Sequence, residues 1–191
     1  MAEEEDKLAS QIMEAFPYLV DIVNLYLEYP DLPADMKPQI LNKQFQPLKD
    51  EELFHRLGGI HSGVTQYVTT DVSKPPQLFN FFNDTRWVFP TEDLAKKYHQ
   101  DKLAMHSEGA EDITKSLSPS ALVGKDCHIF SSPNPKMTNF FYLFQVKNVV
   151  VKMYVARFDR QHREFKLGDA TGIAQKAAQR AEACSSHIQT Q

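Results

Sequence analysis

The sequence predicts an α+β fold in which helices pack on one side of an antiparallel β-sheet built from two aromatic-rich hairpins. Two apolar runs predict the sheet: residues 138–158, the longest such run in the chain, and residues 78–89. Apolar residues that recur at spacings of three and four predict helices near both ends of the chain, over 3–28 and 168–188. We therefore expect a layered sandwich.

The run from Thr138 to Phe158 predicts a β-hairpin with a two-residue turn at Lys147 and Asn148. Strand side chains alternate between faces, so partners across the hairpin share a face. The predicted partners are Val146 with Val149, Phe144 with Val151, Tyr142 with Met153 and Phe140 with Val155. All of them are apolar or aromatic, and a slip of one residue would move the whole set to the opposite face. The pattern therefore predicts the register as well as the hairpin.

Three further segments have the composition of strands. Residues 63–72 are rich in β-branched side chains, and residues 126–131 are a short strand candidate that ends before Pro133 and Pro135. Residues 78–89 predict a second hairpin that turns near Asn83 and Asp84, because both residue types tolerate turn conformations.

The N-terminal part of the chain predicts a helix and a connector. Residues 3–28 form an amphipathic pattern with acidic residues at the helix N-terminus, and Pro17 predicts either a kink or the meeting of two helices near Phe16. A proline-rich run follows. The chain thus divides into an N-terminal helical segment (1–28), a connector (29–48) and an α+β domain (49–191), which we expect to form one compact unit.

Three helices are predicted within the α+β domain. A short helix over 50–58 should end at a Gly-Gly pair, and a second helix, with Thr91 as its N-cap, should run to about His106. The last helix, 168–188, has a narrow face of small residues that would let it lie close against the sheet. The residues of this face are Ala170, Ile173, Ala177, Ala181 and Cys184.

Each half of the chain offers a strand, an aromatic-rich hairpin and then a helix. In element order this layout resembles the Mog1/PsbP-type sandwich, a fold used by several non-enzymatic binding and accessory proteins. The resemblance implies a binding role for this chain.

The composition is that of a soluble globular protein, with 42% hydrophobic residues and a net charge of −4 over 191 residues. No apolar run approaches the roughly 20 residues that a membrane helix needs. The N-terminus is acidic where a secretory signal would be basic and apolar, so we expect a cytoplasmic protein. In that compartment Cys127 and Cys184 are expected to be free thiols, and a single disulfide is the alternative.

The sequence carries no recognisable motif for catalysis, a metal or a cofactor, and we assign no catalytic residue. His99 and His106 lie two helical turns apart, about 10 Å, which is too far to bind one metal ion. Cys127 and His128 are adjacent in a predicted strand, so their side chains point to opposite faces. Nucleic-acid binding is not favoured, because the chain is acidic overall.

The candidate binding surface is on the hairpin over residues 138–158, which we call the main hairpin. It is the reverse face, opposite the face that carries the paired apolar residues listed above. If no helix covers it, it forms an apolar patch with a polar rim, which is typical of a binding site. If a helix covers it, it is a second core. The candidate residues for a ligand or partner are Phe141, Leu143, Lys152 and Tyr154 on this face, with Trp87 from the second hairpin and Arg157 from the end of the first.

Two functions stay open. The first is a non-catalytic partner-binding or accessory protein that binds a protein partner, or a second copy of itself, through its N-terminal helix. The first third of the chain is acidic, and residues 147–180 are basic. This charge asymmetry favours the first function, because it can steer a charged partner toward the protein. The alternative is a small-molecule-binding domain or an enzyme with a pocket between sheet and helices. The candidate lining residues of that pocket are Trp87, His128, Tyr142 and Tyr154.

Overall fold

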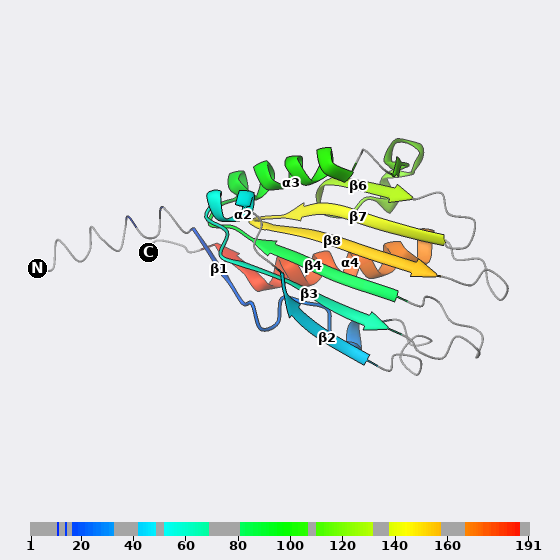
Figure 1. Ribbon diagram of the computed structural model, residues 1–191, viewed down its shortest axis with the longest axis horizontal. Coiled ribbons are helices and arrows are strands. Elements are labelled where there is room, and N and C mark those ends of the chain that lie inside the picture. The colour runs from blue at the N-terminus through cyan, green and yellow to red at the C-terminus, as the bar shows by residue number, and fades with distance from the viewer. Residues whose placement is uncertain are drawn as a thin grey trace, which may run out of the picture.

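A central antiparallel sheet with helices on both sides dominates the computed structural model (Figure 1). The structure describes residues 11, 14, 17–32, 42–48, 52–68, 81–106, 110–131, 138–157 and 167–187. The strands are β1 (Tyr18–Val20), β2 (Asn42–Pro47), β3 (His61–Val68), β4 (Phe81–Val88), β5 (Glu111–Asp112), β6 (Lys125–Ser131), β7 (Thr138–Val146), β8 (Val149–Arg157) and β9 (Ser185–His187). The α-helices are α2 (Glu52–Arg56), α3 (Glu92–His106) and α4 (Leu167–Cys184), and the 3-10 helices are η1 (Tyr29–Asp31), η3 (Thr114–Ser116) and η4 (Pro119–Ala121).

Seven strands form the main sheet in the order β2-β3-β4-β8-β7-β6-β5, and every neighbouring pair is antiparallel. Strands β1 and β9 form a separate two-stranded sheet. The prediction of a mixed helix and strand fold around an antiparallel sheet is confirmed.

The predicted hairpin is confirmed in its register. Strands β7 and β8 pair Val146 with Val149, and the pairing continues unbroken to Thr138 with Arg157. Lys147, in the turn, has a φ of 49°, a left-handed conformation that single residues adopt in tight turns.

The predicted second hairpin is wrong. Residues 81–88 form the single strand β4, which pairs with β3 on one side and β8 on the other. Asp84 lies in the middle of this strand, fully buried, and its carboxylate accepts hydrogen bonds from Arg86 at 2.8 and 3.0 Å. A buried ion pair inside the sheet therefore overrides the turn propensity of the Asn-Asp sequence. Residues 69–72 and 78–80, which also belong to predicted strands, lie outside the described residues.

Helices cover both faces of the sheet, not one. α3 and α2 pack on one face, where Trp87, Leu143 and Val150 share a core with Tyr98 of α3. α4 packs on the opposite face, which holds the larger core. The predicted small-residue face of α4 is confirmed, since Ala170, Ile173, Ala177 and Ala181 are each at most 1% exposed.

Both predicted helix ends in the domain are confirmed. The hydroxyl of Thr91 accepts a hydrogen bond from the backbone N–H of Leu94 at 3.3 Å, as an N-cap does. At the end of α2, Gly58 has a φ of 67°, and Gly59 donates its backbone N–H to the carbonyl of Phe54 at 2.9 Å. These two features form a Schellman motif. The motif requires a residue in the left-handed conformation, which glycine adopts without strain.

The predicted helix over residues 3–28 is wrong from Tyr18 onward. Gln11 and Glu14 are helical, and the rest of residues 1–16 lies outside the described residues. After Pro17 the chain forms β1, which pairs with β9 beyond the end of α4. No helix is described over 18–28, so the expected helical interface to a partner is not supported.

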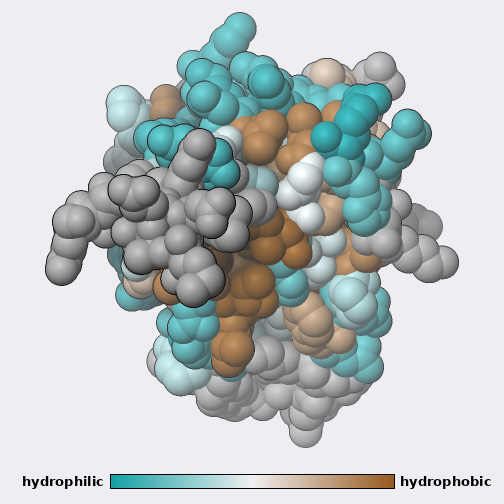
Figure 2. All heavy atoms as spheres, turned by 90° about the vertical axis from the view of Figure 1, so that its left-hand side faces the viewer, coloured by the Kyte–Doolittle hydropathy of each residue, from teal (hydrophilic) through white to brown (hydrophobic). Residues whose placement is uncertain are grey.

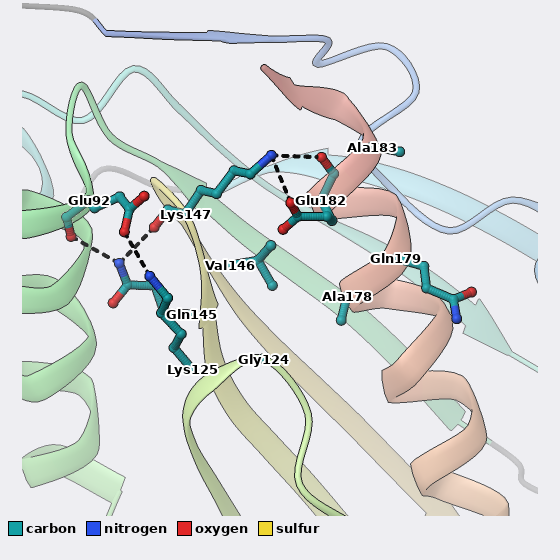
Figure 3. Close-up of a pocket in the computed structure, with 10 residues that line it drawn as sticks. All are labelled: Glu92, Gly124, Lys125, Gln145, Val146, Lys147, Ala178, Gln179, Glu182 and Ala183. Atoms are coloured by element: carbon teal, nitrogen blue, oxygen red, sulfur yellow. Dashed lines mark hydrogen bonds and ion pairs between the residues drawn. The ribbon is translucent and has the colours of Figure 1, made fainter. Parts of the chain in front are cut away.

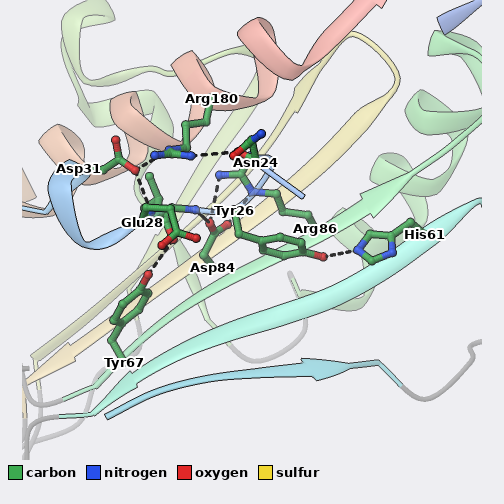
Figure 4. Close-up of polar contacts among 10 residues, drawn as sticks. Asn24, Tyr26, Glu28, Asp31, His61, Tyr67, Asp84, Arg86 and Arg180 are labelled. Atoms are coloured by element: carbon green, nitrogen blue, oxygen red, sulfur yellow. Dashed lines mark hydrogen bonds and ion pairs between the residues drawn. The ribbon is translucent and has the colours of Figure 1, made fainter. Parts of the chain in front are cut away.

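Residues 24–32, which we call the strap, lie across the sheet on the same face as α4 (Figure 4). The strap buries Leu25 and Leu27 completely. Leu27 donates its backbone N–H to the carboxylate of Asp84 at 2.8 Å, and its carbonyl accepts a hydrogen bond from the hydroxyl of Tyr67 at 2.7 Å. The side chain of Arg180 on α4 donates to the carbonyl of Asn24 at 3.0 Å. The strap is therefore part of the core.

The expected connector contributes to the sheet as well. Its start forms η1, and residues 42–47 form the edge strand β2, paired with β3. The proposed division of the chain at residues 28 and 48 stays a prediction.

Replacing Asp84 by alanine should lower the free energy of unfolding by about 3–5 kcal/mol, because Arg86 would stay buried without its partner. Urea denaturation followed by circular dichroism measures this change. The double variant D84A/R86M should be more stable than D84A, since it also removes the uncompensated charge. A D84A protein as stable as the unmodified chain would contradict the structural role of the pair.

Candidate binding pocket

The turn between β7 and β8 joins several elements at one end of the sheet. Asn148 is fully buried, and its side chain donates a hydrogen bond to the carbonyl of Phe89 at 2.6 Å. Its backbone carbonyl accepts one from the backbone N–H of Phe89 at 2.9 Å. The hydroxyl of Ser185 donates to the side-chain oxygen of Asn148 at 2.5 Å. The turn is thus fixed to the end of β4 and to β9.

Lys147, the other turn residue, caps the C-terminal end of α4. Its ammonium group donates to the backbone carbonyls of Glu182 at 3.2 Å and Ser185 at 2.6 Å, and it pairs with the Glu182 carboxylate at 2.9 Å. A cation at this end of a helix is favourable, because the helix dipole is negative there. All three donors of the ammonium group are used within the fold.

Glu92, the first residue of α3, lies on the other side of the turn. Its carboxylate accepts a hydrogen bond from the hydroxyl of Tyr18 and pairs with the ammonium group of Lys125 at 3.0 Å. The side-chain amide of Gln145 donates to the backbone carbonyls of Glu92 at 2.9 Å and Lys147 at 2.7 Å, so β7 holds this helix end in place.

These contacts keep Glu92 ionised and Tyr18 protonated. The hydrogen bond from Tyr18, followed by the interaction with Lys125, lowers the pKa of the Glu92 carboxyl below its ordinary value. Burial, together with the nearby carboxylate of Glu92, raises the pKa of Tyr18 to about 12. The carboxyl is therefore a weak base near neutral pH.

Gly124 brings the loop before β6 against β7. Its φ of 67° is left-handed, and a Cβ at this position would lie 2.7 Å from the carbonyl oxygen of Gln145 and 2.9 Å from the ring of Phe144. Contacts this short require the residue to be glycine or the loop to move.

Together these residues line a pocket of about 640 Å³ between the ends of α3 and α4 (Figure 3). The lining residues are Glu92, Gly124, Lys125, Gln145, Val146, Lys147, Ala178, Gln179, Glu182 and Ala183. Val146 and Ala178 face each other across it, while the charged groups lie in two ion pairs. Figure 2 shows this end of the molecule, where hydrophobic groups gather at the centre and hydrophilic groups surround them.

The structure places four of the predicted site residues on one face of the sheet, because Phe141 pairs with Tyr154 and Leu143 pairs with Lys152 across the hairpin. Trp87 and Leu143 are buried under α3, and Phe141 is 7% exposed. The ammonium group of Lys152 lies 5.5 Å from the centre of the Phe141 ring. Tyr154 is half-buried, and burial raises its pKa.

The reverse face of the hairpin is thus a second core where α3 covers it. Arg157 is the last residue of β8, and its side chain lies outside the described residues. None of these residues lines the pocket, and a binding role for them stays a prediction.

Of the four residues proposed to line a pocket between sheet and helices, Tyr142 lies on the opposite face of the sheet from the other three. Tyr142 points to the α4 side, where its hydroxyl shares a hydrogen bond of 2.8 Å with Thr171, and burial raises its pKa to about 12. Trp87 is in the core on the α3 side. His128 is paired across the strands with Leu143 and so shares that side.

The histidines and thiols give no metal site among the residues that the structure describes. His128 contacts Asp112 at 3.1 Å, and its ring centre lies 6.1 Å from that of the buried His99, whose pKa burial lowers. Cys127 and Cys184 are free thiols, and burial raises the pKa of Cys127 to about 11. No helix in the described ranges is long and apolar enough to cross a membrane.

Sequence reasoning missed the residues of the pocket. They come from four separate segments, and only the paired strands and the two helices bring them together. Two features carried some signal. The turn at Lys147 and the helix start beside Glu92 were predicted, but no local pattern indicated that the two helix ends lie at that turn.

Comparison with known proteins adds little. No protein-family model matches the chain, and no curated protein matches it. Among solved structures, the extracellular domain of PknH from Mycobacterium tuberculosis is similar, with 13% sequence identity and a TM-score of 0.44. The match covers 88% of this chain and 79% of that one. A similarity this low supports no statement about function, and the resemblance to the Mog1/PsbP-type sandwich stays a prediction.

Replacing Tyr18 by phenylalanine should raise the pKa of Glu92 toward its ordinary value of about 4.3, because the variant removes the hydrogen bond. The pKa of Glu92 is lowered in the folded protein. The hydrogen bond from Tyr18 therefore stabilises the folded protein at a pH above the ordinary pKa of Glu92. This stabilisation is lost as the pH falls through the lowered pKa that Glu92 has in the folded protein. An NMR titration of the Glu92 carboxyl carbon tests this, and an unchanged pKa in Y18F would contradict the described contact.

Replacing Gly124 by alanine should lower the free energy of unfolding by about 1–3 kcal/mol, because of its left-handed φ and the close carbonyl of Gln145. Gly172 is the matched control. It lies inside α4, and a Cβ there meets nothing within 4 Å. Gly172→Ala should raise stability by about 0.5–1 kcal/mol. Thermal denaturation of both variants measures the contrast, and equal effects would show that the loop does not need glycine.

Proposed function

We propose that this chain is a non-catalytic binding protein that takes the apolar part of a small molecule into the pocket at the β7–β8 turn. The observation that carries the proposal is the pocket itself, whose volume of about 640 Å³ lies in the range of small-molecule sites. Of the two binding roles open from the sequence, the geometry favours this one over a partner held by an N-terminal helix.

Apolar contact should supply most of the affinity. Val146, Ala178 and Ala183 line the pocket together with the carbon chains of Lys125 and Lys147. A ligand that buries about 200 Å² of apolar surface there would gain about 5 kcal/mol before the costs of association.

The charges around the pocket favour a ligand without a large net charge. Lys125 pairs with Glu92 and Lys147 pairs with Glu182, so the two cations are balanced by two carboxylates. The donors of Lys147 are already used by the end of α4. An uncharged or amphipathic molecule therefore suits the pocket better than a strong anion.

A binding role without chemistry fits the state of the titratable groups. A general base works best when its pKa lies near the working pH. The pKa of Glu92 is moved in the other direction, below the ordinary carboxyl value. The contacts of Glu92 with Tyr18 and Lys125 join elements that surround the pocket. They also leave the Glu92 carboxylate poorly suited to accept a proton.

The neutral fluorescent probe N-phenyl-1-naphthylamine should bind the protein, and Ala178→Trp should weaken this binding at least about tenfold by filling the pocket. The matched control is Gln175→Trp, because Gln175 is exposed on the same helix and does not line the pocket. Fluorescence titration with direct excitation of the naphthyl group measures both affinities.

Equal weakening by the two tryptophan variants would contradict the assignment of the pocket. A sulfonated analogue, 8-anilinonaphthalene-1-sulfonate, should bind no more tightly than the neutral probe. Much tighter binding of the sulfonate would show that the pocket selects anions.

A further inference from the structure

A second pocket, of about 300 Å³, lies between the strap and strands β2 and β3. Three aromatic rings line it: Tyr26 from the strap, Phe45 from β2 and His61 from the start of β3. Glu28, also from the strap, adds a carboxylate to the lining. The two pockets share no lining residue.

The three rings have a defined arrangement. The rings of Phe45 and His61 are nearly parallel, at 7°, with centres 6.3 Å apart. The Tyr26 ring stands at 73° to both, with its centre 5.3 Å from that of Phe45 and 5.8 Å from that of His61. The hydroxyl of Tyr26 shares a hydrogen bond of 2.8 Å with Nε2 of His61 (Figure 4).

Gly63 lets these rings lie close to β3. A Cβ at this position would lie 2.6 Å from the ring of Phe45 and 2.6 Å from the hydroxyl of Tyr26. The arrangement is therefore built into the sheet, although Phe45 is 50% exposed and open to solvent.

The electrostatics of this pocket favour a cation. Aromatic faces and a carboxylate both attract positive charge. The guanidinium of Arg86 already lies 5.7 Å from the centre of the Tyr26 ring, and its own charge is balanced by Asp84. Burial lowers the pKa of His61, so its ring is uncharged near neutral pH and does not repel a cation.

We propose that this second pocket binds the alkylated ammonium group of a small organic cation such as choline. The methyl groups of such a cation weaken its hydration, so it loses less than a bare ammonium when it moves against aromatic rings. Glu28 supplies the opposite charge, and Phe45 supplies the accessible ring.

The test compares choline with 3,3-dimethyl-1-butanol, an uncharged molecule of the same shape, by NMR titration of the labelled protein. Choline should shift the amide signals of Phe45 and His61 and should bind at least about fivefold more tightly than the alcohol. Equal affinities, or no shift at saturating choline, would overturn the proposal.

Two variants separate the contributions. Phe45→Leu keeps an apolar side chain and removes the ring, so it should weaken choline about fivefold and leave the alcohol nearly unchanged. Glu28→Gln should weaken choline alone. The matched control is Phe81→Leu, because Phe81 does not line the pocket. Choline affinity that is insensitive to both pocket variants, or equally sensitive to the control, would contradict the site.

Discussion

The β7–β8 hairpin buries apolar side chains on both of its faces, and this constraint determines the layers of the fold. Leu143 and Val150 lie on one face, Phe144 and Val151 lie on the other, and all four are fully buried. A sheet with two apolar faces needs cover on both sides. Helix α3 supplies it on one side, and α4 with the strap supplies it on the other, so the hairpin is the middle layer of three.

The same arrangement produces the pocket at the hairpin turn. The N-terminal end of α3 and the C-terminal end of α4 both reach this turn. Glu92 in α3 and Lys147 in the turn each place a charge that suits the dipole of the helix end that they contact. Glu92 pairs with Lys125 and Lys147 pairs with Glu182, and all four residues line the pocket. The proposed function therefore depends on how two helices end, and not on a sequence motif.

Sequence reasoning succeeded where one local pattern decided the structure. The alternation along β7 and β8 admits one register, and the small-residue spacing of α4 admits one buried face. It failed where distant residues decided. Asn83 and Asp84 have the sequence of a turn, but in the structure Asp84 lies inside the sheet and pairs with Arg86. Residues 18–28 resemble a helix, but β9 pairs with β1, and the sheet buries both Leu25 and Leu27. The pocket was not predictable because four segments build it.

The proposed function places an apolar ligand between β7 and α4 at the hairpin turn. The most direct measurement is a nuclear Overhauser spectrum of the protein with bound N-phenyl-1-naphthylamine. We predict cross-peaks between the naphthyl protons and the methyl groups of Val146 and Ala178, which line opposite sides of the pocket. Cross-peaks confined to other methyl groups, or none at all under saturating probe, would contradict the account.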